Sequence, residues 1–456
     1  MSLPGWLSSS TVDRGPSRAA PGPAAVVGAA VATATAVLYL LGSGRAYGLD
    51  EATSVARFIA TPSLLDPFQQ QVVYNNHVLL SFLDHLVYSL AGSQDETLLR
   101  LLPVGFAAAA MGLLTYLLSR EWGRLAGATG GAIVATSPLL IENGRQVRGY
   151  SLLVLSAIVA TALFLRLRQR GDTREIGVAY VIALAGGIAT HLYTAALIPV
   201  HASMVTLQVR GVLRWSARWA LAVALGLAIL GGVLGTMVSD AQARTRVFDP
   251  QFPIDLVKAL LGRSALTAVL LVPLLALGAW QLRRQPLFLR AGLAVAALIA
   301  LTWVAAPRDL YPRFFVWLVP AVGLVAARAI ARHRWAAVLG VAVVITQLVR
   351  VAPSLTESDL ASRDASDIAR QAQAGGARVC TFGLSSFALE PYLKGVRSLP
   401  DLGPGQLRRC DVVVQVFTPV ADETSAPRAV ALEFPSRRVL PAQHPGVVRS
   451  RRPLHN

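Results

Sequence analysis

Apolar stretches of about 20 residues recur along most of this chain, and charged residues separate most of them from the next. A helix needs roughly 20 mostly apolar residues to cross the hydrocarbon core of a bilayer, so each stretch predicts a membrane-spanning helix. The windows lie at 24–42, 98–119, 123–141, 149–166, 175–190, 192–209, 219–238, 259–280, 288–306, 311–328 and 335–351. The sequence therefore predicts an α-helical polytopic membrane protein with about 11 transmembrane helices.

The overall composition agrees with a membrane protein and nearly excludes water-soluble folds. Hydrophobic residues make up 54% of the chain and charged residues 15%, and the mean hydropathy is +0.53. The net charge of +17 comes almost wholly from arginine, because Lys258 and Lys394 are the only lysines. The arginines lie in short clusters between the apolar windows, where the positive-inside rule accounts for them, so no nucleic-acid partner is expected. Glycines inside the windows, such as Gly127–Gly131, are interpreted as helix-packing surfaces.

The distribution of charge predicts which connections face the cytoplasm. Under the assignment above, the arginine clusters at 14–18, 120–124, 166–174, 210–218, 283–290 and 328–334 all fall on one side, which is therefore cytoplasmic. Most acidic residues fall in the alternate connections, which face outward. The longest of these is the first outer loop, residues 43–97. Residues 1–23 are expected to be a disordered cytoplasmic tail. The windows and the charge distribution together predict a multi-pass plasma-membrane protein with a cytoplasmic N-terminus.

Residues 352–456 differ in character from the apolar region at 24–351. They are polar and of mixed charge, with an expected helix at 365–375 and expected strands at 378–382 and 411–416. This pattern predicts a small extracytoplasmic α/β domain. It holds the only two cysteines, Cys380 and Cys410, which outside the cytoplasm are either a disulfide or two unrelated buried thiols.

The first outer loop carries an acidic pair, Asp50 and Glu51, directly before Ala52–Ala60, whose apolar residues recur at helical spacing. This stretch and Val78–Leu90 predict helices lying in the membrane interface. One interpretation makes Asp50 an N-cap and Glu51 a first-turn partner of the helix dipole. The other is catalytic, because ionisable groups at a bilayer surface are costly to desolvate and are functional candidates by default. A carboxylate there could be a general base that takes a proton from an acceptor hydroxyl as it attacks a sugar carbon.

Two histidines are further candidates. The segment Asn76-His77 precedes the second interfacial stretch and is either a turn with an asparagine cap or a place where His77 donates to a phosphate oxygen. His191 and Tyr193 lie between two close windows on the outer side, where they either face a cavity or pack in the core. Asp84 and His85 are expected on the solvent-facing side of the second interfacial stretch.

Several arginines lie in connections predicted to face outward, contrary to the positive-inside rule. A pair with Glu142, a lipid headgroup or a bound anionic substrate would each explain those near residue 145. Arginines from separate connections could converge on a phosphate, because a planar guanidinium binds it bidentately and stabilises the charge that grows on a phosphate leaving group. The candidates are Arg145, Arg148 and Tyr150 in one connection, Arg308, Tyr311 and Arg313 in another, and Arg244 and Arg246 in a third.

The order and sidedness of these segments resemble the GT-C superfamily of polyprenyl-phosphate-sugar glycosyltransferases, especially the family that includes protein O-mannosyltransferases and the aminoarabinose transferase of lipid A. The resemblance implies a sugar donor on a polyprenyl phosphate, an extracytoplasmic acceptor (glycan, lipid or protein), and a first-loop acid, carried onto Asp50 alone, that is a catalytic base or lies beside a divalent cation. The commoner form of the second segment is His-Pro-Pro or Lys-Pro-Pro, whereas this chain has Asn76-His77-Val78.

The sequence analysis thus favours an integral membrane glycosyltransferase with Asp50 as general base. A transporter or flippase of lipid-linked saccharides is the main alternative, but transporters place ionisable groups near the bilayer midplane, whereas here the polar residues gather at one face. A non-catalytic scaffold of the cell envelope is a third interpretation.

Overall fold

The computed structural model describes residues 21–69, 77–170, 173–205, 209–243, 249–305, 310–356, 374, 379–381, 412–416, 438–441 and 447–451. The chain forms two compact units. The helical unit comprises residues 1–41, 68–80 and 100–355, and the second unit comprises residues 42–67, 81–99 and 356–456. The domain boundaries expected from the sequence, at 24–351 and 352–456, stay predictions.

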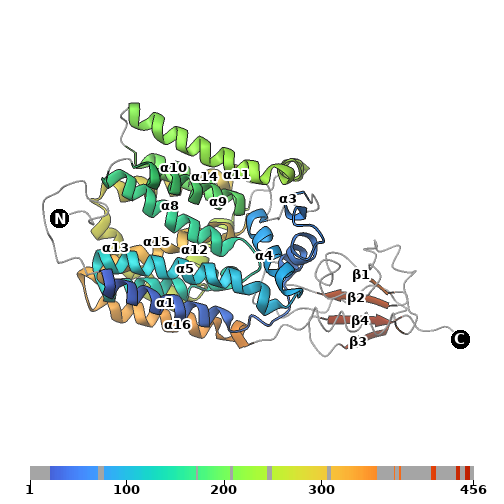
Figure 1. The fold of residues 1–456 in the computed structure, drawn as a ribbon. Coiled ribbons are helices and arrows are strands. Elements are labelled where there is room, and N and C mark those ends of the chain that lie inside the picture. Colours follow the sequence, from blue (N-terminus) through green and yellow to red (C-terminus); the bar gives the residue numbers. More distant parts are fainter. Residues whose placement is uncertain are drawn as a thin grey trace. The chain divides into compact units, whose positions relative to one another are not determined.

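Helices account for nearly all of the described structure before residue 357 (Figure 1). The N-terminal half contains α1 (Pro21–Leu40), α2 (Leu49–Ser54), the π-helical turn η1 (Val55–Ile59), α3 (Asp66–Gln69), α4 (Val78–Ala91), α5 (Glu96–Trp122), α6 (Arg124–Ala135), α7 (Pro138–Gly144), α8 (Tyr150–Arg170), α9 (Arg174–Thr190), the 3₁₀ turn η2 (Leu192–Ala196) and α10 (Leu197–Ser203). The remaining helices are α11 (Val209–Ala243), α12 (Phe252–Leu260), α13 (Ala265–Leu282), α14 (Pro286–Ala305), the 3₁₀ turn η3 (Pro312–Leu318), α15 (Val319–Arg332) and α16 (Ala336–Thr356).

The described residues contain eight helices long and apolar enough to cross a membrane, or nine if the pair α6 and α7, bent by 61°, is one broken span. The predicted fold class, a helical polytopic membrane protein, is confirmed at this level, but the count of about 11 is not. The difference arises mainly around His191. There the backbone is extended, α9 ends after 17 residues, and the window 192–209 holds η2 and the seven-residue α10 rather than one long helix.

Glycine lets the helices of the helical unit approach closely. A Cβ atom on Gly28 of α1 would lie 2.8 Å from the carbonyl oxygen of Gly112 in α5, and one on Gly130 of α6 would lie 2.8 Å from the Cβ of Ala327 in α15. The interpretation of Gly127–Gly131 as a packing surface is therefore confirmed. In Figure 1, α8, α9 and α11 lie beside one another, and α9 packs against both of its neighbours.

The described strands of the second unit form one sheet of four, in the order β1 (Val379–Thr381), β2 (Val412–Val416), β4 (Val447–Arg451) and β3 (Arg438–Pro441). Strand β1 is parallel to β2, with Cys380 opposite Val413, and the other two pairings are antiparallel. The expected strands at 378–382 and 411–416 are present as β1 and β2. The expected helix at 365–375 lies almost wholly outside the described residues, as does Cys410, so the α/β domain and the disulfide stay predictions.

Candidate functional site

His77 lies directly before α4 in the helical unit, and its imidazole is held from both sides. The Nδ1 atom is 3.1 Å from the carbonyl oxygen of Thr190, at the C-terminal end of α9. The Nε of Arg148, in the connection between α7 and α8, donates to His77 Nε2 at 3.2 Å. A carbonyl oxygen can only accept and an arginine Nε–H can only donate. His77 is therefore neutral, with its proton on Nδ1.

His191 follows α9 and faces the same group of residues. Its Nδ1 accepts a hydrogen bond from the backbone N–H of Tyr193 at 3.3 Å. With Nδ1 as the acceptor, a neutral His191 carries its proton on Nε2, where it can donate to a ligand. The His77 and His191 rings lie 5.1 Å apart, centroid to centroid.

Aromatic rings join the two histidines to two arginines. The Tyr150 ring, at the start of α8, lies 5.4 Å from the His77 ring and 5.5 Å from the His191 ring. The Arg148 guanidinium lies 5.2 Å from the centre of the Tyr150 ring. The Phe314 ring of η3 lies 5.9 Å from the His191 ring and stacks on the Tyr193 ring at 5.1 Å, centroid to centroid. We name His77, Arg148, Tyr150, His191, Tyr193, Arg313 and Phe314 the histidine–arginine cluster.

Arg313 brings a second cation to the cluster from η3. Its guanidinium lies 4.6 Å from the centre of the Tyr311 ring and 5.9 Å from that of Phe314. Burial and the nearby charge of Arg148, with a further contribution from Arg313, hold the pKa of His77 well below its usual range. The same causes lower the pKa of His191 to about 3. Burial and two neighbouring guanidinium groups thus both favour the neutral form of each imidazole.

The cluster also has a hydrogen-bond donor that no other described residue accepts. The Tyr150 side chain is fully buried, and its hydroxyl has no hydrogen-bond partner among the described residues. A buried hydroxyl without a partner costs about 1–3 kcal/mol, so such a group points to a ligand that completes it. Positive charge and available donors together suit an anion.

Gly149 allows the connection between α7 and α8 to pass close beneath His77. A Cβ atom on Gly149 would lie 2.5 Å from the Thr190 Cγ2 and 2.9 Å from the His77 Nδ1, which is closer than real Cβ contacts. The absence of a side chain at this position is what lets Arg148, one residue earlier, reach the imidazole.

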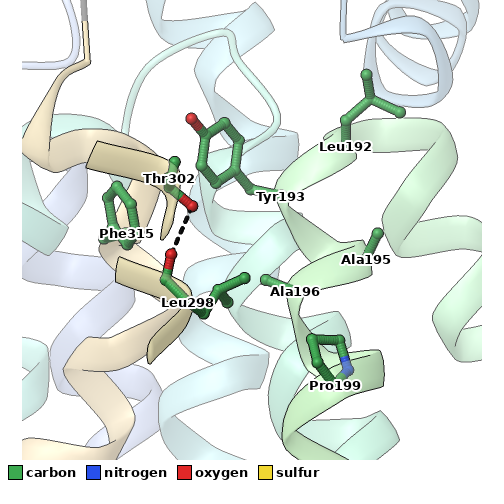
Figure 2. A pocket seen from close by; sticks show the side chains of 8 residues that line it. All are labelled: Leu192, Tyr193, Ala195, Ala196, Pro199, Leu298, Thr302 and Phe315. Atoms are coloured by element: carbon green, nitrogen blue, oxygen red, sulfur yellow. Dashed lines mark hydrogen bonds between the residues drawn. The ribbon is translucent and has the colours of Figure 1, made fainter. Parts of the chain in front are cut away.

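An apolar groove of about 380 Å³ adjoins the cluster (Figure 2). Tyr193 belongs to both the cluster and the lining of the groove, and Phe315, whose ring lies 5.5 Å from that of Tyr193, also lines it. Figure 2 shows Leu192, Ala195, Ala196 and Pro199 along one wall and Leu298 and Thr302 along another. The Thr302 hydroxyl donates to the Leu298 carbonyl oxygen at 2.7 Å, so it presents no free donor to the groove. Tyr193 is a cavity candidate from the sequence. The other lining residues were missed, because small and apolar side chains inside apolar windows carry no signal that distinguishes a groove from packing.

Arg145 has a different environment from Arg148. Its side chain is fully buried and donates to the carbonyl oxygens of Leu41 at 3.3 Å and Ser354 at 3.0 Å. Glu142, considered above as a partner for the nearby arginines, forms an ion pair with Arg263 at 2.7 Å.

The acidic pair lies in the second unit, at the start of α2. The N-cap of this helix is Gly48, so the interpretation of Asp50 as the N-cap is wrong, and Asp50 lies in the first helical turn. Glu51 reaches back instead, and its carboxylate accepts the Gly48 N–H at 3.2 Å. Glu51 is buried, whereas Asp50 is half-buried. The segments expected to form interfacial helices are helical, as α2 with η1 and as α4.

The expected solvent exposure of Asp84 and His85 is contradicted. Both side chains are buried, and His85 bonds through Nδ1 to the Ile59 carbonyl oxygen at 2.7 Å. Burial raises the pKa of Asp84 well above its usual range. For His85, the partner is the last residue of η1, which lies far from α4 in the sequence.

The other expected site residues are only partly described. Asn76 and Arg308 lie outside the described residues, as do Arg244 and Arg246. Tyr311 is described beside Arg313. The described residues contain no group of three or more histidine, cysteine or acidic side chains that could hold a metal ion.

Comparison with solved structures identifies the fold. The chain superposes on ArnT from Cupriavidus metallidurans bound to undecaprenyl phosphate with a TM-score of 0.61 and 15% identity, over 93% of this chain and 97% of that one. The apo form of the same protein gives a TM-score of 0.60 and 16% identity, over 92% and 97% of the two chains. This is a GT-C fold.

The GT-C fold is also found in the Archaeoglobus fulgidus oligosaccharyltransferase, solved in complex with Zn and sulfate. The TM-score is 0.53 at 12% identity, over 86% of this chain and 68% of that chain. A scan with protein-family models found no match, and neither did a search of curated protein sequences. The resemblance drawn from the short motifs is therefore confirmed as a GT-C fold.

Proposed function

We propose that this chain is an integral membrane glycosyltransferase that moves a monosaccharide from a polyprenyl-phosphate donor to an extracytoplasmic acceptor hydroxyl. The observation that carries the proposal is the histidine–arginine cluster beside an apolar groove, within a fold shared with a protein that was solved bound to undecaprenyl phosphate. A lipid phosphate needs a cationic, donor-rich site for its head and an apolar surface for its tail. The cluster and the groove supply these two features side by side.

The phosphate would be held by Arg148 and Arg313. Each guanidinium is delocalised and presents several N–H groups to phosphate oxygens. The Tyr150 hydroxyl and the Nε2–H of His191 would complete the site as neutral donors. His77 would assist indirectly, because its Nε2 accepts from Arg148 and thereby orients that guanidinium.

The tail would begin in the groove. Tyr193 belongs to both the cluster and the groove wall. The first isoprenoid units attached to a phosphate at the cluster would therefore enter the apolar groove. The far wall is formed by α14, which has no buried residues and many exposed apolar side chains. A helix of this kind suits a boundary between protein and lipid, past which a long isoprenoid chain can continue into the bilayer.

In the proposed reaction, Asp50 is the general base. Its carboxylate takes the proton of the acceptor hydroxyl while the hydroxyl oxygen attacks the anomeric carbon of the sugar. The bond between that carbon and the phosphate oxygen breaks, and the electron pair leaves with the polyprenyl phosphate. Arg148 and Arg313 stabilise the negative charge that grows on this leaving group. Glu51 is assigned a structural role in stabilising the start of α2, because its carboxylate is buried and bonded to the Gly48 N–H.

The proposal places the acidic loop, the cluster and residues 352–456 on the extracytoplasmic side, with the N-terminus in the cytoplasm. Asn76, Arg308 and Tyr311 stay candidates for the same cavity. A divalent cation beside Asp50 stays open, as do the identity of the sugar and of the acceptor.

The test is sugar transfer by purified protein in lipid nanodiscs, with a panel of polyprenyl-phosphate sugars and product detection by mass. Asp50→Asn is expected to abolish transfer, while undecaprenyl phosphate binding changes less than about twofold. Unchanged turnover by Asp50→Asn would remove Asp50 as the base. If the wild-type protein binds the lipid phosphate but transfers no sugar from any donor, the transporter or scaffold interpretation replaces the enzyme.

A further inference from the structure

Arg145 lies only three residues before Arg148, yet its hydrogen bonds lead to different parts of the helical unit. Its Nη1 donates to the carbonyl oxygen of Leu41, the residue that follows α1, and its Nη2 to that of Ser354, in the last turn of α16. One guanidinium thus joins three segments that are far apart in the sequence.

The two acceptors mark the places where the chain leaves the helical unit. Leu41 is the last residue before the first outer loop enters the second unit, and Leu355, next to Ser354, is the last residue before the C-terminal region does so. The carbonyl groups at a helix C-terminus carry partial negative charge and lack partners within the helix. A buried cation that donates to both helix ends satisfies these carbonyls and fixes their separation.

Through its own backbone, Arg145 is tied to the phosphate-binding candidates. The connection from Arg145 to Gly149 is short, and within it Arg148 bonds to His77 while Gly149 packs against Thr190. Arg145 therefore joins the connection that carries Arg148 to the ends of α1 and α16. Asp50 lies nine residues beyond Leu41 in the loop that begins at this junction.

We propose that Arg145 is a positioning residue that anchors the start of the Asp50-bearing loop to the connection carrying Arg148. The expected effect on catalysis rests on the proposed transferase function. The anchoring of the loop by Arg145 does not depend on that function. It gives Arg145 a different role from the phosphate ligand expected from the sequence, since two of its nitrogens already donate to main-chain carbonyls.

The test compares Arg145→Met and Arg145→Lys with Arg148→Met. Arginine spans two carbonyls with separate nitrogens, whereas the single nitrogen of lysine can replace only part of this arrangement. Arg263→Met is the matched control, because it removes a guanidinium that contacts the neighbouring helix α7 through Glu142. Three quantities are measured in nanodiscs: sugar transfer, undecaprenyl phosphate affinity, and amide hydrogen exchange of residues 42–54 and 150–165.

The expected result for Arg145→Met is a fall in kcat of tenfold or more, with donor KM and lipid-phosphate affinity within about twofold of wild type. Exchange of residues 42–54 rises, and that of residues 150–165 does not. Arg145→Lys lies between wild type and Arg145→Met, and the Arg263→Met control leaves kcat and the exchange of residues 42–54 unchanged.

Three results would overturn the inference. Loss of lipid-phosphate affinity by Arg145→Met to the extent seen with Arg148→Met would make Arg145 a phosphate ligand. Unchanged kcat and unchanged exchange would remove any role. A uniform rise in exchange throughout the helical unit would reduce Arg145 to a general stabilising residue. If the wild-type protein transfers no sugar, the proposed function fails separately, and exchange of residues 42–54 alone decides the anchoring.

Discussion

The substitution Arg148→Met tests the histidine–arginine cluster most directly. Methionine keeps much of the length and apolar volume of the arginine stem but removes the guanidinium. The interactions lost from the protein itself include the hydrogen bond to His77 Nε2 at 3.2 Å and the contact with the Tyr150 ring at 5.2 Å. With a lipid phosphate bound, the variant would also lose one of the two cations assigned to the phosphate.

The size of the effect follows from the burial of Arg148, whose side chain has 0% exposure. Removing one partner from a buried, charge-assisted contact with an anion costs about 2–4 kcal/mol of binding free energy. This corresponds to a loss of affinity of roughly 30- to 700-fold. The free energy of unfolding is expected to change by less, because the unpaired His77 Nε2 costs about 1–3 kcal/mol while removal of a buried cation offsets part of that cost.

The assay is a titration of wild-type protein and variants in nanodiscs with undecaprenyl phosphate, followed by native mass spectrometry, with thermal unfolding measured in parallel. Arg148→Lys, which keeps the charge but lacks the planar fork, is expected to bind with intermediate affinity. Arg120→Met is the control for loss of one positive charge, since Arg120 bonds to Tyr116 in α5 and is not part of the cluster. An affinity of folded Arg148→Met within about twofold of wild type would refute the assignment of the cluster to the lipid phosphate.

Three further predictions concern the walls of the site. Gly149→Ala should lower the free energy of unfolding by ~1–3 kcal/mol, because its Cβ would lie 2.5 Å from the Thr190 Cγ2, whereas Gly105→Ala, with nothing within 4 Å, should be neutral or stabilising in the same thermal assay. Burial and Arg148 lower the folded-state pKa of His191 to about 3 from an ordinary value of 6.5, so the unfolded chain takes up this proton first as the pH falls. The free energy of unfolding is therefore unaffected by this proton above the ordinary value and falls by roughly 2 kcal/mol by about pH 5. Thermal unfolding of His191→Gln should depend less on pH in this interval than that of the wild type. Equal pH dependence of the two proteins would contradict the shift. Ala196→Phe should obstruct the groove and lower undecaprenyl phosphate affinity about tenfold, with little effect on butyl phosphate, and equal loss for both ligands would argue against a tail site.

The helical fold could be predicted from the sequence largely because apolar length is a local property. Most predicted windows coincide with described helices, and α2 with η1 and α4 occupy the two expected interfacial stretches. The count of crossings was less predictable around His191. The apolar composition continues through this residue, but its backbone is extended, and the hydrogen bond from the Tyr193 N–H to the imidazole begins a separate 3₁₀ turn.

Local signals also gave incomplete information about side-chain environment. Residue type makes Asp50 a candidate N-cap, yet the N-cap is Gly48, two residues before it, and Glu51 supplies the bond to the N-cap backbone. Asp84 and His85 were expected in water because they are polar residues on an amphipathic helix. For His85, the partner is the carbonyl oxygen of Ile59 in η1, 26 residues away in the sequence, which no pattern within α4 indicates.

The contrast between Arg145 and Arg148 shows where sequence reasoning about the site ends. Both arginines lie at the same outer mouth and run against the same charge trend, so residue type and sidedness assign them the same role. Their partners differ because the connection turns between them: Arg145 reaches carbonyls 104 and 209 residues away, whereas Arg148 reaches an imidazole 71 residues away. Those separations are properties of helix packing, which is set by close contacts such as that of Gly149 with Thr190 rather than by any pattern within the segment itself. An arginine that already satisfies helix-end carbonyls is suited to holding the framework. One beside a neutral imidazole and a tyrosine hydroxyl that bonds to no other described residue is suited to binding an anion.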